Sequence, residues 1–166
     1  PCRDDGRQTD AQRLRDLKTT LDRVRDGVFI FDPETLRFSY VNHSAIEQIG
    51  YDEATLLDMH PFDIKPDFDE AHFRALLGPL RRGELSELRF ETRHRHCDGH
   101  DIPVEVFMQY LAPPDQPARY VSVVRDIAER KAYEATLAQQ VRDLSATEEH
   151  LQRSQAAAEQ ANQAKA

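Results

Sequence analysis

Cysteine is scarce in this sequence: Cys2 and Cys97 are the only two among 166 residues. Two cysteines so far apart cannot supply a disulfide framework, and their scarcity fits a reducing compartment. No apolar run approaches the ~18 residues that a membrane-spanning helix needs. The polar start is unlike a signal peptide. We therefore expect a cytoplasmic segment that has no membrane partner of its own.

An excess of positive charge is also missing. The net charge is −8, with 22 basic and 30 acidic residues, and no basic stripe alternates with aromatic residues. The electrostatic signature of nucleic-acid binding is therefore absent, and we exclude DNA and RNA as partners. No Walker loop or Ser-His-Asp pattern stands out, and chance carboxylate pairs carry no weight among so many acids. We expect no catalytic residues and no enzyme activity in this chain.

The two ends of the sequence have helical patterns. Residues 1–9 are polar and predict a disordered lead-in, whereas residues 10–26 place apolar side chains three and four apart, as in an amphipathic helix that ends at Gly27. Residues 128–166 contain no Gly or Pro and predict one long signalling helix with a similar seam. The apolar seam residues of the two helices are Leu14, Leu17, Leu21, Val24, Leu137, Val141, Leu144 and Leu151.

An isolated helix in water would not retain such a seam, so we expect a coiled coil with a second copy of the chain, as a parallel homodimer. Polar Glu148 and Gln155 occupy seam positions near the C-terminal end. They weaken the pairing and leave the coiled coil able to change its register or crossing angle.

The middle of the chain, residues 27–127, changes from helical to strand periodicity. Strands are predicted over 28–31 and 36–41, short helices follow, and three more strands begin near 88, 102 and 119. This order predicts an α+β domain with a five-stranded antiparallel sheet and short helices on one face. The first and last strands are apolar on both faces, so we expect the N-terminal helix to cover the second face. Pro79 predicts a kink or an early end in the helix that begins near Asp69.

Several short motifs in this middle region resemble a known family. They are DGVFIFD at 26–32, YVNHSA at 40–45, IGY at 49–51, RHRHCDG at 93–99 and VVRDIAERK at 123–131. In this order, from Leu21 to Lys131, they resemble a PAS domain with its C-terminal PAC portion. The resemblance implies the PAS fold and a sensory function. It places a signal junction at Asp126, Ile127 and Arg130, where the last strand meets the exit helix.

The sequence near the C-terminus extends this resemblance. Residues 157–165 (AAEQANQAK) are similar to the segment that precedes the phospho-accepting histidine of hybrid sensor histidine kinases. We therefore expect a PAS sensor and dimerisation module that relays a signal through a coiled coil to a kinase domain of the same chain. The alternatives are a sensor for a diguanylate cyclase, and a docking module without ligand that binds another protein through its outer sheet face.

A ligand pocket in a PAS domain lies between the sheet and the helices. The residues expected to line it are Val41, Ile46, Leu57, Phe62, Ile64, Phe73, Leu77, Phe90, Val104, Val106 and Met108. Their apolar and aromatic character is consistent with a small apolar ligand, and equally with a packed core that has no cofactor.

Haem, flavin and metal binding each depend on a few specific residues. His72 lies on the helix that carries the haem ligand in PAS oxygen sensors, but Arg89 and Arg93 are expected to point outward and could not donate to bound oxygen. We interpret His72 as a residue at the edge of an apolar stripe. Flavin photochemistry needs a cysteine between residues 51 and 64, and the sequence has none there. The one metal-like cluster is His94, His96, Cys97 and His100 around a hairpin turn, where the alternative is an exposed hairpin without metal.

Overall fold

The computed structural model describes residues 12, 15–17, 19, 20 and 25–165. It divides the chain into two compact units, Pro1–Ile127 and Ala128–Ala166. In chain order the first unit contains β1 (Gly27–Phe31), β2 (Phe38–Val41), α2 (His43–Ile49), α3 (Glu53–Leu57), the 3-10 helix η1 (Pro61–Ile64), α4 (Glu70–Arg81), β3 (Leu88–Arg95), β4 (Asp101–Leu111) and β5 (Arg119–Asp126). The second unit consists of α5 (Ala128–Ala164).

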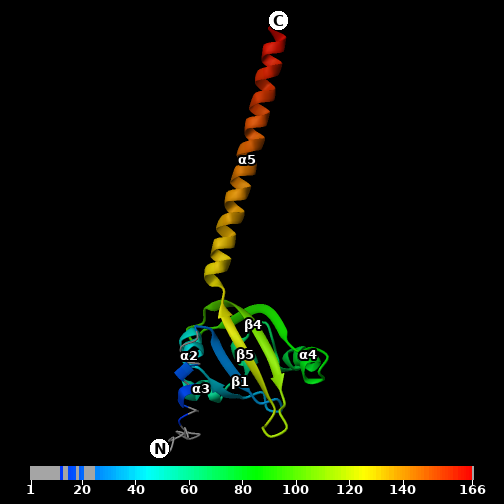
Figure 1. Ribbon diagram of the computed structural model, residues 1–166. Helices are drawn as coiled ribbons and strands as arrows, with labels where there is room; N and C mark the ends of the chain where they lie inside the picture. The colour runs from blue at the N-terminus through cyan, green and yellow to red at the C-terminus, as the bar shows by residue number, and fades with distance from the viewer. Residues whose placement is uncertain (1–11, 13–14, 18, 21–24, 166) are drawn as a thin grey trace, which may run out of the picture. The chain divides into compact units, whose positions relative to one another are not determined.

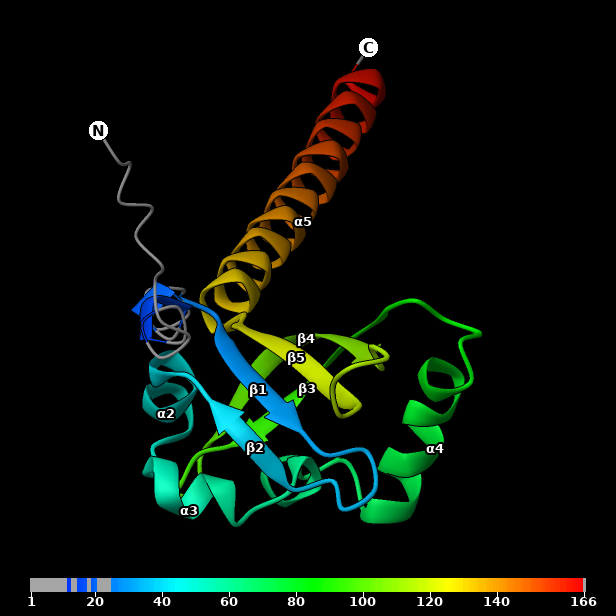
Figure 2. The ribbon, with the colours of Figure 1, turned by 60° about the horizontal axis from the view of Figure 1, so that its bottom comes forward.

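The five strands form one antiparallel sheet in the order β2-β1-β5-β4-β3. The first and last strands of the domain are therefore neighbours at its centre, as Figure 2 shows for β1 and β5. β3 and β4 are joined by the tight turn at Asp98-Gly99, where Gly99 has a φ of +97°. The predicted five-stranded sheet is confirmed.

The helices bury their apolar side chains on one face of this sheet. Phe29 and Phe31 of β1 share one buried cluster with Ile49 of α2, and Phe73 of α4 lies with its ring centroid 6.0 Å from that of Phe31. Alternate residues of β4, in the same sheet, face this core as well. Because side chains alternate between the faces of a strand, the remaining β4 and β5 residues form a second, outer face.

Two local predictions were wrong in detail. β2 begins at Phe38 rather than Leu36, because the Asp32 carboxylate accepts the backbone N–H groups of Glu34 and Thr35 at 2.8 Å and extends the turn. Leu36 follows with a φ of 58° and a buried side chain. α4 continues through Pro79 to Arg81, so the predicted early end is wrong, whereas the predicted kink stays a prediction. Leu77 and Leu80 are buried in the core on either side of the proline and hold the helix there.

The predicted N-terminal helix is described only in part. The backbone is helical at residues 12, 15–17, 19 and 20, and Leu17 is exposed. The other seam positions there, Leu14, Leu21 and Val24, lie outside the described residues, as does the 1–9 lead-in. In the described part of the chain, no helix is both long and apolar enough to span a membrane.

Candidate functional site

The predicted pocket residues come together in the core between the sheet and the helices. Four of the eleven, Ile46, Leu57, Phe62 and Phe90, are partly buried against it. The other seven are fully buried: Val41, Ile64, Phe73, Leu77, Val104, Val106 and Met108. Whether a ligand enters among these side chains stays a prediction.

Two basic side chains lie inside this apolar core, and sequence reasoning missed the burial of both. Lys65 directly follows η1 and is 3% exposed, and His94 occupies an inward position of β3 at 0% exposure. Within the described residues, neither ring nitrogen of His94 has a hydrogen-bond partner. The signal was present in the alternation of β3, since His94 follows Leu88, Phe90 and Thr92 at intervals of two.

Burial dominates the electrostatics of this pair. It lowers the pKa of Lys65 from 10.5 to about 7, because the charged ammonium is removed from water. It also holds the pKa of His94 well below 6.5, with a further contribution from the nearby charge of Lys65. His94 meets Phe29 edge to face, with ring centroids 6.0 Å apart.

Asn42 joins the sheet to the first helix of the domain. Its Oδ1 accepts the N–H of Val28 at 2.8 Å and the N–H of Ala45 at 3.0 Å, and its Nδ2 donates to the carbonyl of Asp26 at 3.1 Å. The side chain is fully buried, so it caps α2 and holds the start of β1 at the same time.

The outer face of the sheet carries a shallow groove of ≈ 380 Å³, lined partly by Phe107, Val121 and Val123. The Arg89 guanidinium lies 5.0 Å from the Phe107 ring centroid and donates to the buried Glu105 carboxylate at 2.6 and 3.0 Å. Arg89 and Arg93 both point away from the core, as expected.

The helix α5 is one uninterrupted segment of 37 residues (Figure 1), and none of them is buried. Its seam is nevertheless apolar: Leu137, Val141, Leu144 and Leu151 are 44%, 62%, 62% and 56% exposed. Exposed leucine and valine at heptad spacing are what a coiled-coil helix presents before it is paired.

The predicted signal junction begins at the end of the first unit. Asp126 is the last residue of β5, and Ile127 is buried with its N–H donated to the carbonyl of Pro103 at 3.0 Å. Ile127 therefore belongs to the buried interior of the first unit. Arg130, on α5, pairs with Glu134 at 3.6 Å.

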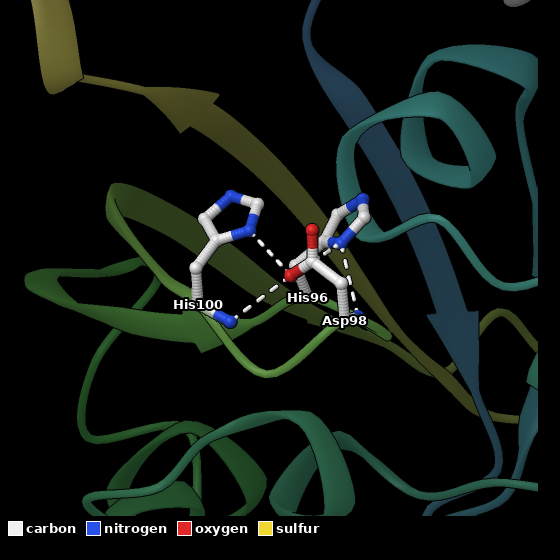
Figure 3. Close-up of side chains that lie close together, drawn as sticks. All are labelled: His96, Asp98 and His100. Atoms are coloured by element: carbon white, nitrogen blue, oxygen red, sulfur yellow. Dashed lines mark hydrogen bonds and ion pairs between the residues drawn. The ribbon is translucent and has the colours of Figure 1, made fainter.

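The candidate haem ligand and the candidate metal ligands lie in different parts of the domain. The His72 side chain is 77% exposed and lies 2.8 Å from the Asp69 carboxylate, outside the core. His96 and His100 stack at the β3–β4 turn with ring centroids 4.6 Å apart, and Asp98 lies between them (Figure 3). His94 points into the core instead of toward this cluster. Cys97 is an exposed, free cysteine.

The family profile described as "PAS domain" matches residues 25–129. This chain belongs to the PAS domain family. The match covers the whole sheet and the four short helices of the first unit, so the chain contains a sensory module with the PAS fold. The resemblance noted in the sequence motifs is confirmed.

Two named proteins are similar to this chain over only part of their own length. The chain is 33% identical over 138 residues to the cell-division control histidine kinase PdhS of Brucella anthropi, and 28% identical over 118 residues to the methyl sulfide methyltransferase-associated sensor of Methanosarcina acetivorans. These matches cover 81% and 71% of this chain but 13% and 12% of those proteins.

A solved structure shows the same fold. A domain of the sensory box sensor histidine kinase/response regulator from Geobacter sulfurreducens superposes with a TM-score of 0.58 at 22% identity, covering 70% of this chain and 96% of that one.

Proposed function

We propose that this chain is a PAS sensor and dimerisation module that relays a signal through a coiled coil to a histidine kinase domain of the same protein. The observation that carries the proposal is α5: a 37-residue helix without a buried residue, whose apolar side chains repeat at heptad positions. The PAS membership of residues 25–129 supports the sensory part, and the likeness to PdhS supports the kinase part.

The mechanism is a shift between two populations. A signal that changes packing in the core alters the position of Ile127. This residue lies between the last residue of β5 and the first residue of α5. Two copies of α5 pair in parallel, and the polar Glu148 and Gln155 keep their pairing weak enough for a second register. Only a small difference in free energy is then needed to change which arrangement dominates.

The ligand and the location belong to the same proposal. The proposal has two forms. In one, a small apolar ligand binds among the core residues; in the other, the core relays the signal without a ligand. Neither form needs a cofactor. The scarcity of cysteine, with two in 166 residues, favours a reducing, cytoplasmic location. Absorption spectroscopy and mass spectrometry of the purified protein test for a retained ligand or haem.

Sedimentation equilibrium tests the dimerisation directly. The wild-type chain should sediment as a dimer, and Val141→Glu and Leu144→Glu should each weaken association at least tenfold, because a charge enters the seam. Ala146→Glu is the matched control, since this α5 position lies outside the heptad seam. A monomeric wild type, or equal effects of all three substitutions, would contradict dimerisation through the α5 seam.

A second candidate is favoured by the groove on the outer sheet face. In that case Phe107, Val121 and Val123 dock a different protein, and α5 acts as a plain linker. Val123→Glu would then abolish partner binding and leave a monomeric chain otherwise unchanged. A diguanylate cyclase output is the alternative for the effector, and phosphorylation of the parent protein in the presence of ATP distinguishes a kinase from it.

A further inference from the structure

The β3–β4 turn brings two imidazoles and a carboxylate together. The Asp98 Oδ1 lies 3.0 Å from Nδ1 of His96 and 2.5 Å from Nδ1 of His100. All three groups can offer a ligand atom within 4.8 Å of the others. Figure 3 shows the His96 and His100 rings on either side of the Asp98 carboxylate.

We propose that His96, Asp98 and His100 bind one divalent transition-metal ion. Two neutral imidazoles and one carboxylate form a donor set that suits Zn²⁺, Cu²⁺, Ni²⁺ or Co²⁺ better than the oxygen-seeking Mg²⁺ and Ca²⁺. In a tetrahedral zinc site, bonds of ~2.0–2.1 Å place the ligand atoms roughly 3.3 Å apart. The observed spacings between the Asp98 oxygen and the two imidazole nitrogens, 3.0 and 2.5 Å, are shorter than that value, so both rings must move away from the carboxylate to admit the ion.

The backbone of the turn is organised without the ion. His96 donates its N–H to the carbonyl of His100 at 2.8 Å, and Gly99 donates to the carbonyl of His96 at 2.9 Å. The N–H of Cys97 bonds the carbonyl of Ile49 at 2.9 Å, which fastens the turn to the end of α2. Little conformational entropy is therefore lost on metal binding, because the three ligands are already held on one short segment.

Other histidine–carboxylate contacts in the described part of the chain lack a second imidazole. His60 lies 2.9 Å from Asp63, and His72 lies 2.8 Å from Asp69, each as a single pair. An isolated pair is an ordinary capping contact. At the turn, a second ring converges on the same carboxylate oxygen, and this distinguishes a chelating site from a surface ion pair.

The site differs from the cluster suggested by sequence spacing. His94 is buried in the core, and Asp98 takes its place. The Cys97 sulfur lies 3.8 Å from Nδ1 of His96 but does not join the group of mutually close ligand atoms. We assign three protein ligands, with the remaining coordination position open to water.

Isothermal titration calorimetry with Zn²⁺ tests this assignment on the full chain, after treatment with a chelator and in a Cys2→Ser background that removes the other thiol. One equivalent should bind. His100→Gln and Asp98→Asn should each weaken binding at least tenfold. Asn at position 98 retains an acceptor for the N–H of His100, which now bonds Asp98 Oδ1 at 3.0 Å, so the turn should stay folded.

Two controls make the result specific. His72→Gln removes an exposed histidine beside an aspartate outside the turn, and Cys97→Ser removes the neighbouring thiol. Both should bind Zn²⁺ as tightly as the background protein, and two-dimensional amide NMR should show zinc-induced shifts confined to the turn and the end of α2. No binding of Zn²⁺, Co²⁺, Ni²⁺ or Cu²⁺, unchanged binding in His100→Gln and Asp98→Asn, or a loss in Cys97→Ser would overturn the assignment.

Discussion

The ammonium nitrogen of Lys65 lies 5.7 Å from the ring centroid of Phe73, within the core of the PAS domain. The attraction between a cation and a ring face offsets part of the cost of burying the charge. It does not remove that cost, because burial still lowers the Lys65 pKa to about 7. A buried lysine that is half-protonated near neutral pH makes the stability of the domain depend on pH.

Lys65→Met should stabilise the domain, and most strongly at low pH. Above pH 7 folded Lys65 loses its proton, whereas the unfolded chain keeps it up to about pH 10.4. The unfolded state then binds more protons, so wild-type stability gains from this residue as the pH rises from 7 to about 10. The pKa shift limits the pH-dependent part of this difference to about 5 kcal/mol.

Urea denaturation at pH 6.5 and pH 9.5 measures this difference. The advantage of Lys65→Met should shrink markedly at the higher pH, because the neutral amine is less costly to bury. Lys131→Met is the control, since Lys131 is exposed. A difference between Lys65→Met and wild type that stays constant over this range would contradict the buried charge.

Asn42→Ala should destabilise the domain more than the loss of an ordinary helix cap. It removes the shared acceptor of Val28 and Ala45 inside the protein, and we expect a cost of about 2–3 kcal/mol. Asp52→Ala removes the exposed cap of α3, which accepts from Thr55 at 2.7 Å, and should cost about 1 kcal/mol. Chemical denaturation of both variants gives the comparison, and equal losses would show that Asn42 is only a cap.

Gly50→Ala should disturb the contact between α2 and the β3–β4 turn. Gly50 has a φ of +81°, and an added Cβ would lie 2.3 Å from Nε2 of His96 and 2.7 Å from the Cys97 sulfur. Gly83 has a similar φ of +73° with nothing within 4 Å, so Gly83→Ala isolates the backbone strain of about 1 kcal/mol. Thermal denaturation should show a larger loss for Gly50→Ala, and matching losses would mean that His96 and Cys97 move aside freely.

The junction variants should separate signalling from stability. Ile127→Ala should cost about 2–4 kcal/mol, because it leaves a cavity at a buried position. Asp126 is exposed, so Asp126→Ala should lower the melting temperature by only a few degrees. If the proposed kinase relay operates, the same substitution should change kinase output in the parent protein. Autophosphorylation and calorimetry measure the two effects. A wild-type output in Asp126→Ala would leave the junction as a plain linker.

Much of this architecture is predictable from sequence because it depends on local chemistry. Alternation defined the strands, Asp98-Gly99 defined the hairpin, and Gly50 ended α2 with a left-handed residue. The start of β2 was harder to predict. Leu36 fits the apolar pattern of a strand, but the side chain of Asp32 extends the preceding turn past it. Pro79 misled because tertiary burial of its neighbours outweighs the local preference for a helix end.

The interior of the domain could be predicted only in outline. Its apolar members follow the helix and strand periods, so they could be grouped before any contact was known. Lys65 could not be placed, because its burial depends on how the segment after η1 folds over Phe73. The turn cluster contains Asp98 instead of His94. Strand alternation turns His94 inward, whereas the tight turn brings residues 96 and 100 together.

The parallel pairing of α5 is tested most directly by electron paramagnetic resonance distances. A single spin label at Gln160→Cys, in a Cys2→Ser and Cys97→Ser background, lies outside the seam near the end of α5. Two parallel helices, each ~10–12 Å wide, should hold the two labels roughly 20 Å apart. Antiparallel overlap centred on α5 would separate them by roughly 40 Å along the axis at 1.5 Å per residue. A narrow distribution near the shorter value is the predicted result, and the longer distance, or no dipolar coupling, would contradict a parallel signalling coiled coil.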